Sequence, residues 1–377
     1  MRAALISVLL VSSVAHAHGG SGDHDSPQWC GEHLAVVGDG GVLVDGKLVK
    51  VPVTVALIAW SPACDRLVVA HERVWLIDAA TRNVRDLGAP VGGFDSAMRM
   101  DGPAPSIRWS PSGKAFALVL VSETIDHMAV ARYDAASGKG VLLPTNGEVK
   151  AFALVDDTHA VVAFRAQGAN DMHLVTADER AAKSLNNTAY KEAMFSIAPV
   201  VLGLVRTTDE LVLVDRTTGT ERSLVSKVDY LQAMSADGSH ALAVVGLKPA
   251  SIDATGVAST FDGNLVYGSV SDEGTGWNAS GTLTVVPALK TWAISAIGAK
   301  VRPWTGLPKG TVDHVSVHPD GKRAAFVVEV EEPLGKRDHH CDYEGRSRAD
   351  LYVGELGAQA KPRKIATIAH LHSCAIE

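Results

Sequence analysis

Two groups of histidines carry the residue types that most clearly suggest chemistry. His339 and His340 precede Cys341 in a polar stretch, and His370 and His372 lie two positions apart near the C-terminus. Residues i and i+2 of a β-strand share one face, so His370 and His372 point the same way if they lie in a strand. Imidazole is a ligand of zinc and of copper. The four histidines therefore predict a zinc or copper site, provided that the two groups meet in the fold.

A disulfide accounts for the same region without a metal. Cys341 follows His340 directly, and Cys374 continues the alternation of His370 and His372. The two cysteines can form a bond that the histidines merely surround. We favour the disulfide over the metal, because the histidines lack the regular ligand spacing of a metal motif. Zinc or copper stays the alternative.

The N-terminus has the three-part layout of a secretory signal peptide. Arg2 supplies a positive charge, residues 3–14 are apolar, and Ala15 and Ala17 are the small residues of a cleavage site. We therefore predict that residues 1–17 are a signal peptide and that a soluble protein is exported, to a periplasm or to the extracellular space. An even number of cysteines in an exported chain predicts disulfides. The four are Cys30, Cys64, Cys341 and Cys374.

The composition excludes several classes of protein. Of the 377 residues, 46% are hydrophobic, which suffices for a large core and excludes a disordered chain. The net charge of −7, without a basic stripe, argues against a nucleic-acid partner. Beyond the signal peptide no apolar run reaches ~18 residues, so we predict no transmembrane segment. The common catalytic motifs are absent from the sequence, and no catalytic residue is assigned.

The interior of the chain repeats one block. Each copy has an apolar run, a short polar turn, a second apolar run and two further short strands. This order predicts a four-stranded antiparallel meander. Six whole copies begin near residues 55, 106, 151, 193, 230 and 312.

The two ends of the chain each hold part of a further copy. Residues 34–37, 42–44 and 48–51 look like three strands that lack a first strand, and residues 369–375 look like a first strand alone. Together they predict a composite blade that closes a ring. The predicted fold is therefore all-β, a β-propeller of seven four-stranded blades closed by pairing of the N- and C-terminal strands.

We expect a single propeller domain over residues 30–377, preceded by a flexible leader at 18–29. Three stretches are predicted to be insertions between strands: 90–104, 247–282 and 331–348. Insertions in repeat arrays concentrate on binding faces, so these three are expected to build a ligand surface at the mouth of the channel.

The turns after the first strands resemble the repeats of TolB-like propellers. The clearest are Ser110-Pro111-Ser112-Gly113-Lys114, Ser235-Ala236-Asp237-Gly238-Ser239 and His318-Pro319-Asp320-Gly321-Lys322. WD-repeat propellers are less similar, because no copy contains a Trp-Asp or Gly-His pair. The resemblance spans roughly residues 53–368 and implies a propeller fold with an exported binding role, but no particular ligand.

The same turns favour one disulfide pairing. Cys64 lies in the turn between the first and second strands of its blade, and Cys30 precedes the second strand of the neighbouring blade. Both turns fall at the same end of the ring, which favours a Cys30–Cys64 bond and leaves Cys341 with Cys374. The rival Cys30–Cys374 bond would seal the ring at its junction.

Trp60 and Trp109 stand at equivalent ends of two first strands. We expect both indoles to pack between blades rather than to stack on a ligand.

Two functions remain open. The first is a monomeric propeller that binds a protein or a small molecule and has no chemistry of its own. The alternative is a metal-dependent propeller enzyme, of hydrolase or lactonase type, that uses the histidine cluster at the channel mouth. Metal analysis of the purified protein distinguishes the two, because only the enzyme requires a stoichiometric ion.

Overall fold

The computed structural model describes most of the chain. The described residues are 27–52, 57–97, 107–122, 128–145, 147–166, 169–195, 201–234, 240–246, 248–261, 276–277, 283–288, 291–331, 343–357 and 362–375. The predicted signal peptide and nearly all of the predicted leader lie outside these ranges. No helix within them is long and apolar enough to cross a membrane.

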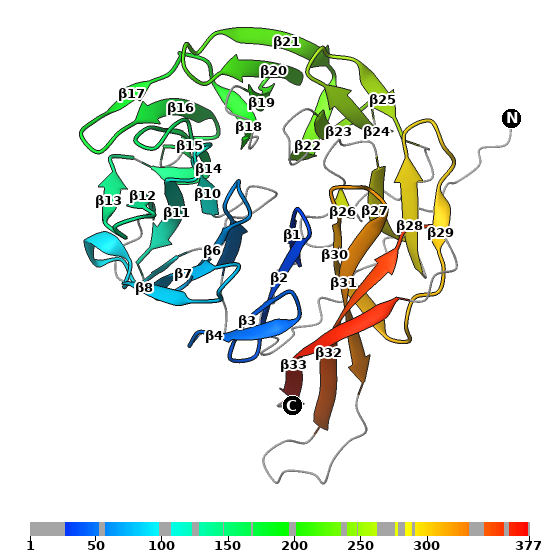
Figure 1. The fold of residues 1–377 in the computed structure, drawn as a ribbon. Coiled ribbons are helices and arrows are strands. Elements are labelled where there is room, and N and C mark those ends of the chain that lie inside the picture. Colours follow the sequence, from blue (N-terminus) through cyan, green and yellow to red (C-terminus); the bar gives the residue numbers. More distant parts are fainter. Residues whose placement is uncertain are drawn as a thin grey trace, which may run out of the picture.

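The described strands form eight antiparallel meanders arranged around a ring, which we call blades 1 to 8 (Figure 1). Blade 1 consists of β1 (Gln28–Cys30), β2 (His33–Gly38), β3 (Gly41–Val44) and β4 (Lys47–Lys50). Blade 2 consists of β5 (Leu57–Trp60), β6 (Arg66–Ala70), β7 (Val74–Asp78) and β8 (Val84–Gly88). Blade 3 consists of β9 (Ser96–Ala97), β10 (Ile107–Trp109), β11 (Ala115–Val121), β12 (Met128–Asp134) and β13 (Gly140–Leu143), and a 3₁₀ turn, η1 (Val91–Gly93), precedes it.

The next two blades belong to one eight-stranded sheet, in which Met172 pairs with Tyr190. Blade 4 consists of β14 (Glu148–Leu154), β15 (Ala160–Arg165), β16 (Met172–Ala177) and β17 (Ala182–Ser184). Blade 5 consists of β18 (Tyr190–Phe195), β19 (Val201–Arg206), β20 (Glu210–Asp215) and β21 (Glu221–Ser226).

Three further meanders complete the ring. Blade 6 consists of β22 (Val228–Met234), β23 (His240–Val245), β24 (Lys248–Asp253) and β25 (Ala258–Thr260). Blade 7 consists of β26 (Gly276–Trp277), β27 (Leu283–Ala288), β28 (Thr291–Ala296) and β29 (Arg302–Trp304). Blade 8 consists of β30 (Thr311–Val317), β31 (Arg323–Glu331), β32 (Tyr343–Glu355) and β33 (Arg363–Ala375).

This strand order defines a β-propeller. Within each blade, strands that follow one another in sequence pair side by side, except for the short β9 of blade 3, which pairs with β11. The first strands face the centre of the ring, while the fourth strands form the rim (Figure 1). Except between blades 6 and 7, the first strands of neighbouring blades contact each other. The predictions of an all-β propeller and of four-stranded blades are therefore confirmed.

The prediction of seven blades with a composite closing blade is wrong. Residues 28–30 supply blade 1 with its own first strand, which pairs with β2 from Gln28–Ala35 to Cys30–His33. Residues 369–375 are the continuation of β33, and they pair with the start of β32 rather than with blade 1. No strand is therefore exchanged between the two ends of the described chain.

The predicted insertion at 247–282 is also corrected. Its first part contains β24 and β25, the third and fourth strands of blade 6. Its last part contains β26, which pairs with β27 and begins blade 7. The stretch thus joins two blades, and blade 7 is the one missing from the predicted count. Its two-residue first strand, Gly276–Trp277, is too short to produce the alternating pattern of a strand.

The hydrophobic core is divided into layers between neighbouring blades. Successive side chains of a strand point to opposite faces, so each central strand serves two layers. In β2, Ala35 and Val37 pack against blade 2, whereas Leu34 and Val36 pack against blade 8. Equivalent clusters join blades 2 and 3, 3 and 4, 4 and 5, 5 and 6, and 7 and 8. Blades 1 to 5 and blade 8 are therefore each packed against two neighbours by described side chains.

The junction between blades 8 and 1 is closed by side-chain packing and a few hydrogen bonds, without a strand shared between the two blades. Leu34 and Val36 meet Val327, Leu351 and Ile368, all of them 5% exposed or less. One backbone hydrogen bond crosses the junction, from the amide of Asp39 to the carbonyl of Ile368 at 2.6 Å.

The crossing hydrogen bond requires a glycine beside it. A Cβ atom at Gly38 would lie 2.7 Å from the carbonyl oxygen of Ile368, closer than side-chain carbons come to backbone atoms. Only glycine lets the two blades approach this closely.

An aspartate that ends the third strand recurs as a turn-former. Asp78, Asp134 and Asp215 each accept a hydrogen bond from the backbone amide three residues further on, at 2.6–2.8 Å. These amide hydrogen bonds lower the pKa of all three carboxyl groups. The ionised aspartate is the form that holds the turn between the third and fourth strands.

Asp156 forms a similar hydrogen-bonded turn between the first and second strands of blade 4, β14 and β15, and its pKa yields a test of acid stability. Burial raises its pKa, but hydrogen bonds from Thr158 and His159 outweigh burial and lower the pKa to about 2. A carboxyl whose pKa falls on folding stabilises the fold above its unfolded pKa, and this contribution is lost as the pH falls towards 2. In urea unfolding, we expect Asp156→Asn to be less stable than the wild type at pH 7, with the difference disappearing between about pH 4 and 2. A difference that is constant with pH contradicts this account.

Candidate functional site

Two of the four predicted metal ligands, His370 and His372, do not lie in a strand that lines the channel. His339, His340 and Cys341 lie outside the described residues, and so do the side chains of His370, His372 and Cys374. The backbone of His370 and His372 pairs with Arg348 and Arg346 in β33, which is the fourth strand of blade 8. The interpretation that placed these two histidines in a channel-lining first strand is therefore wrong.

Metal binding and the Cys341–Cys374 bond both stay predictions. Within the described part of the chain, no group of three or more His, Cys, Asp or Glu side chains is arranged to hold a metal ion.

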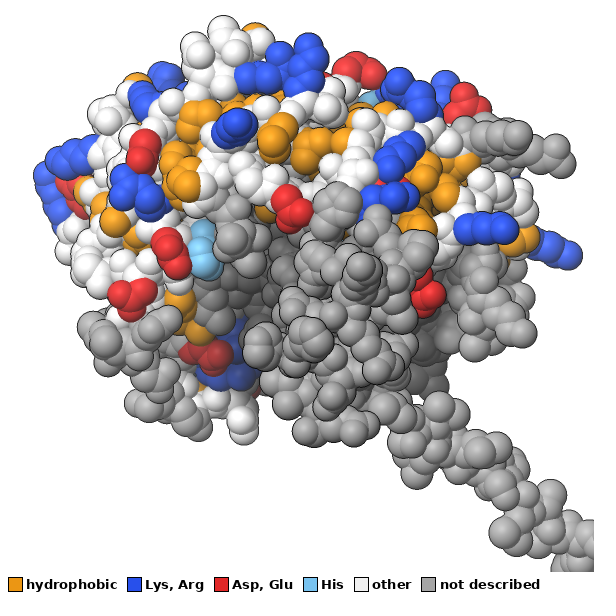
Figure 2. Space-filling model, turned by 90° about the horizontal axis from the view of Figure 1, so that it is seen from below, with side chains coloured by type: hydrophobic (Ala, Val, Ile, Leu, Met, Phe, Trp, Pro, Cys, Tyr) orange, Lys and Arg blue, Asp and Glu red, His pale blue; other side chains and the backbone are white. Residues whose placement is uncertain are grey.

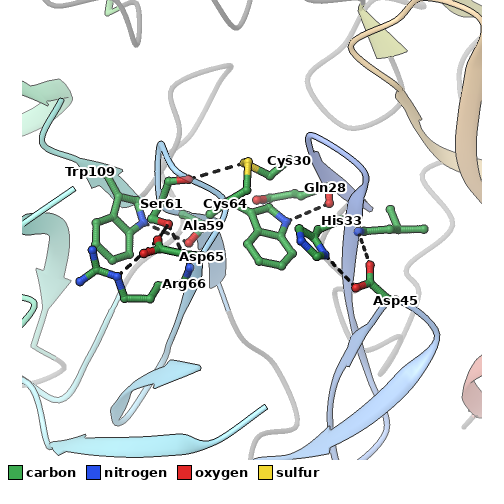
Figure 3. The surroundings of a disulfide bond; sticks show 12 residues. Gln28, Cys30, His33, Asp45, Ala59, Ser61, Cys64, Asp65, Arg66 and Trp109 are labelled. Carbon is green, nitrogen blue, oxygen red and sulfur yellow. Dashed lines mark hydrogen bonds and ion pairs between the residues drawn. A yellow bond between two sulfur atoms is a disulfide. The ribbon is translucent and has the colours of Figure 1, made fainter. Parts of the chain in front are cut away.

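Cys30 and Cys64 form a disulfide that joins blades 1 and 2 (Figure 3). Cys30 ends β1, and Cys64 lies in the turn between β5 and β6. These are equivalent turns of adjacent blades, at the same end of the ring, which is the reason for which the pairing was predicted. The Cys30–Cys64 prediction is confirmed.

Three tryptophans at the ends of first strands donate hydrogen bonds to the preceding blade. The indole Nε1 of Trp29 donates to the carbonyl of Ser316 in blade 8, at 3.2 Å. Trp60 donates in the same way to Gln28 in blade 1, and Trp109 to Ala59 in blade 2, both at 3.1 Å. The indoles thus connect blades 8, 1, 2 and 3 in order. Packing of Trp60 and Trp109 between blades, as predicted, is confirmed, and Trp29 extends the series.

A cationic or aromatic side chain from the preceding blade covers each of these indoles. The guanidinium carbon of Arg66 lies 5.4 Å from the ring centre of Trp109. The guanidinium carbon of Arg323 lies 5.8 Å from the ring centre of Trp29. The imidazole of His33 is 5.8 Å from the ring of Trp60. These three residues, His33, Arg66 and Arg323, are the first residues of β2, β6 and β31. The contact with an indole therefore recurs at the start of the second strand of the blade.

The same side chains also reach the next turn. Arg66 donates through Nη2 to the carbonyl of Gly113 at 2.9 Å, and Nη2 of Arg323 lies 3.0 Å from both carboxylate oxygens of Glu32. Between blades 1 and 2, the Cys30–Cys64 bond connects the corresponding turns. One end of the ring is therefore held by a continuous series of contacts from blade 8 to blade 3.

Blade 8 carries a histidine where blades 2 and 3 carry a serine. His318 is 3% exposed, and its ring meets the ring of Trp29 edge-on at 4.7 Å. Its Nδ1 accepts the backbone amide of Asp320 at 3.1 Å. In blades 2 and 3, Ser61 and Ser110 instead accept a backbone amide through the hydroxyl. The imidazole keeps the turn and adds an aromatic contact across the ring junction.

A groove of about 340 Å³ opens between blades 2 and 3 beside this series of contacts. Its lining consists of Arg66, Leu76, Asp78, Asn83, Val84, Arg85, Ala135 and Ala136. Leu76 is buried, whereas Val84 on the rim strand β8 is 40% exposed. Arg85 closes one side by donating to the carbonyls of Ala135 and Ala136 in blade 3. The groove combines an apolar floor with a few polar groups on rigid turns.

The described residues that line this groove include none of the predicted site residues. Val84 and Leu76 belong to ordinary strand patterns, and nothing in the sequence separates them from the equivalent residues of other blades. The residue of the groove that the sequence marks is Arg85, because it is a cation on a rim strand. In the structure, Arg85 donates to a carbonyl in the turn of the following blade.

No protein-family model and no curated protein matches the sequence. Many solved structures are similar. They include the Cps50 (Swd1) β-propeller domain of Myceliophteria thermophila, with 14% identity and a TM-score of 0.45 over 72% of this chain and 92% of that chain. They also include the hydrazine synthase of Kuenenia stuttgartiensis (14%, 0.42, 71% and 91%) and a chain of the mitotic checkpoint complex (12%, 0.47, 86% and 95%). At these identities and TM-scores the similarity carries no argument about function. The resemblance to TolB-like repeats is not confirmed.

The disulfide leads to a prediction about stability. Cys30 and Cys64 are separated by 34 positions, so reducing the bond releases a loop of this length in the unfolded chain. In the chain-entropy model we expect the double variant Cys30→Ser, Cys64→Ser to lose about 3–4 kcal/mol of unfolding free energy. Equilibrium unfolding in urea under non-reducing conditions measures the loss. Equal stability of the two proteins contradicts the bond.

The indole hydrogen bonds lead to a second prediction. Replacing Trp29 by Phe keeps an aromatic ring between the blades but removes the donor to Ser316. We expect Trp29→Phe to lower the unfolding free energy by about 1 kcal/mol, and Trp109→Phe, which removes the bond to Ala59, to cost a similar amount. Urea unfolding of both variants measures the losses. If Trp29→Phe leaves the unfolding free energy unchanged while Trp109→Phe lowers it, the indole hydrogen bond does not stabilise the junction between blades 8 and 1 as it does the interface between blades 2 and 3.

Proposed function

We propose that the protein is an exported, monomeric β-propeller that binds a protein or a small molecule through the groove between blades 2 and 3. The observation that carries the proposal is the groove itself, with buried Leu76 as its floor and half-exposed Val84 on its side. Its volume of about 340 Å³ falls at the lower end of the range for ligand sites, which are mostly apolar with a few fixed polar groups. It is large enough for a few side chains of a partner or for a compact molecule.

The walls of the groove are preorganised, which favours binding. Arg66 is held by the Trp109 ring and by the carbonyl of Gly113. Asp78 accepts two hydrogen bonds from Thr81, and Arg85 is held by two carbonyls of blade 3. A ligand therefore does not have to order these side chains, and less of the binding energy is lost.

The described part of the face shown in Figure 2 does not favour a polyanionic partner. On the face shown in Figure 2, Lys and Arg side chains are interspersed with Asp and Glu, and hydrophobic side chains form a band among them. A nucleic acid is bound through a continuous basic surface. Together with the net charge of −7, this favours a protein or small-molecule ligand.

Export is supported by two independent features. Residues 1–17 have the layout of a signal peptide, and Cys30 forms a disulfide with Cys64. Structural disulfides persist mainly in oxidising compartments.

A substitution in the groove tests the proposal. Val84→Glu puts a charge on the apolar side of the groove, and we expect it to abolish recovery of any specific ligand or partner from an extract of the source cells. The matched control is Leu48→Glu, since Leu48 is an exposed apolar residue (48%) on β4, the rim strand of blade 1, outside the groove. Both variants should unfold at the wild-type temperature, because each replaces an exposed side chain. If every wild-type partner is recovered equally well with Val84→Glu, the groove is not the binding site.

A further inference from the structure

Two buried arginines, one on blade 3 and one on blade 5, form no direct ion pair with a described residue. Arg108 on β10 is 8% exposed, and Arg216, directly after β20, is 2% exposed. Arg108 donates through Nη2 to the carbonyl of Phe195 on β18, and its Nε has no partner. Neither Nε nor Nη2 of Arg216 has a hydrogen-bond partner. A buried charge without a partner is strongly unfavourable, so this arrangement calls for a reason.

The two guanidinium groups are close enough to affect each other. Burial, and then the charge of Arg216, lower the pKa of Arg108 to about 9. Burial lowers the pKa of Arg216 to about 10, against the opposing effect of the adjacent Asp215. The carboxylate of Asp215 itself accepts the amides of Thr217 and Thr218 in its own turn. Both arginines therefore stay charged at neutral pH and repel each other.

Both arginines depart from the pattern of the repeat. Arg216 follows the turn-forming Asp215, and the residues in the same place of blades 2 and 3 are the buried Ala79 and Ala135. Arg108 pairs with Ala117 in β11, and its equivalent in blade 2, which pairs with Val68, is Ala59.

Alanine thus satisfies the fold at both positions, and arginine is not needed for the turn or the strand. Departures from the pattern that are not compensated locally mark functional positions. The two departures lie near each other, since Arg108 reaches Phe195 of blade 5, and Phe195 is connected through its strand partner Leu202 to Val214, two residues before Arg216.

We propose that Arg108 and Arg216 bind a doubly charged oxyanion of the phosphate or sulfate type, either free or as part of a larger ligand. The Nε–Nη2 edge of a guanidinium is the edge that donates two parallel hydrogen bonds to two oxygens of one group, and this edge of Arg216 is unpaired. Two positive charges are neutralised by an anion with two negative charges. This site is separate from the groove between blades 2 and 3 and does not depend on it.

Thermal unfolding with inorganic phosphate tests the site. At constant ionic strength, we expect phosphate at about a hundredfold excess over its Kd to raise the Tm of the wild type by roughly 3–6 °C relative to chloride. Arg216→Ala restores the alanine of blades 2 and 3, so it should fold, with a Tm in chloride at or above that of the wild type, and it should not respond to phosphate. The matched control Arg222→Ala, an exposed arginine of the same blade, should respond as the wild type does.

Two results overturn the proposal. One is a wild-type Tm that phosphate does not raise above the value in chloride. The other is an Arg216→Ala variant that retains the full phosphate response. Isothermal titration with inorganic phosphate and with glycerol 1-phosphate then separates the sources, because tighter binding of the ester indicates a larger ligand and equal binding indicates the free ion. The Val84→Glu variant should keep the phosphate response. The phosphate test therefore stays valid even if the groove between blades 2 and 3 does not bind a ligand.

Discussion

The structure depends on how the two ends of the ring meet. A closed array whose blades are each built from consecutive residues has no strand shared across its junction, so the backbone ladder cannot hold the first and last blades together. The junction between blades 8 and 1 is held instead by a layer of buried side chains, one backbone hydrogen bond from Asp39 to Ile368, and the contacts of Trp29. If this junction opens, two hydrophobic sheet faces are exposed to water at once.

The junction uses the same contacts that hold blades within the chain. Trp29 and Arg323 repeat across the junction what Trp109 and Arg66 do between blades 2 and 3. Closure of the ring therefore needs no additional structural element. It needs only that blade 1 makes with blade 8 the contacts that other neighbouring blades make with each other. The disulfide between Cys30 and Cys64 adds a covalent connection one interface away. The groove lies at the next interface along the ring, and its polar side chains are held by their own contacts within blades 2 and 3.

The sequence predicts those parts of the fold whose residues follow local rules. The repeated meanders, the tryptophans between blades and the Cys30–Cys64 bond follow from turn chemistry and alternation, which act over a few residues. The composite blade was a wrong inference because β1, at Gln28–Cys30, has only three residues and alternation cannot be recognised over so short a strand. Blade 7 was missed for the same reason. The buried pair Arg108 and Arg216 needs the structure, since the two residues are distant in the chain and only the ring brings their blades together.

Amide hydrogen exchange at Asp39 tests the closure most directly. Its amide donates to Ile368 across the junction at 2.6 Å, while the amide of Asp45 donates to Leu34 within blade 1 at 2.8 Å and serves as the internal reference. Both amides lie on blade 1, and they differ in whether their partner belongs to the same blade. A ring closed by packing predicts that the Asp39 amide is protected from exchange to nearly the same degree as the Asp45 amide. If Asp39 exchanges at the rate of an unpaired surface amide while Asp45 stays protected, the ring is open at this junction and the account is wrong.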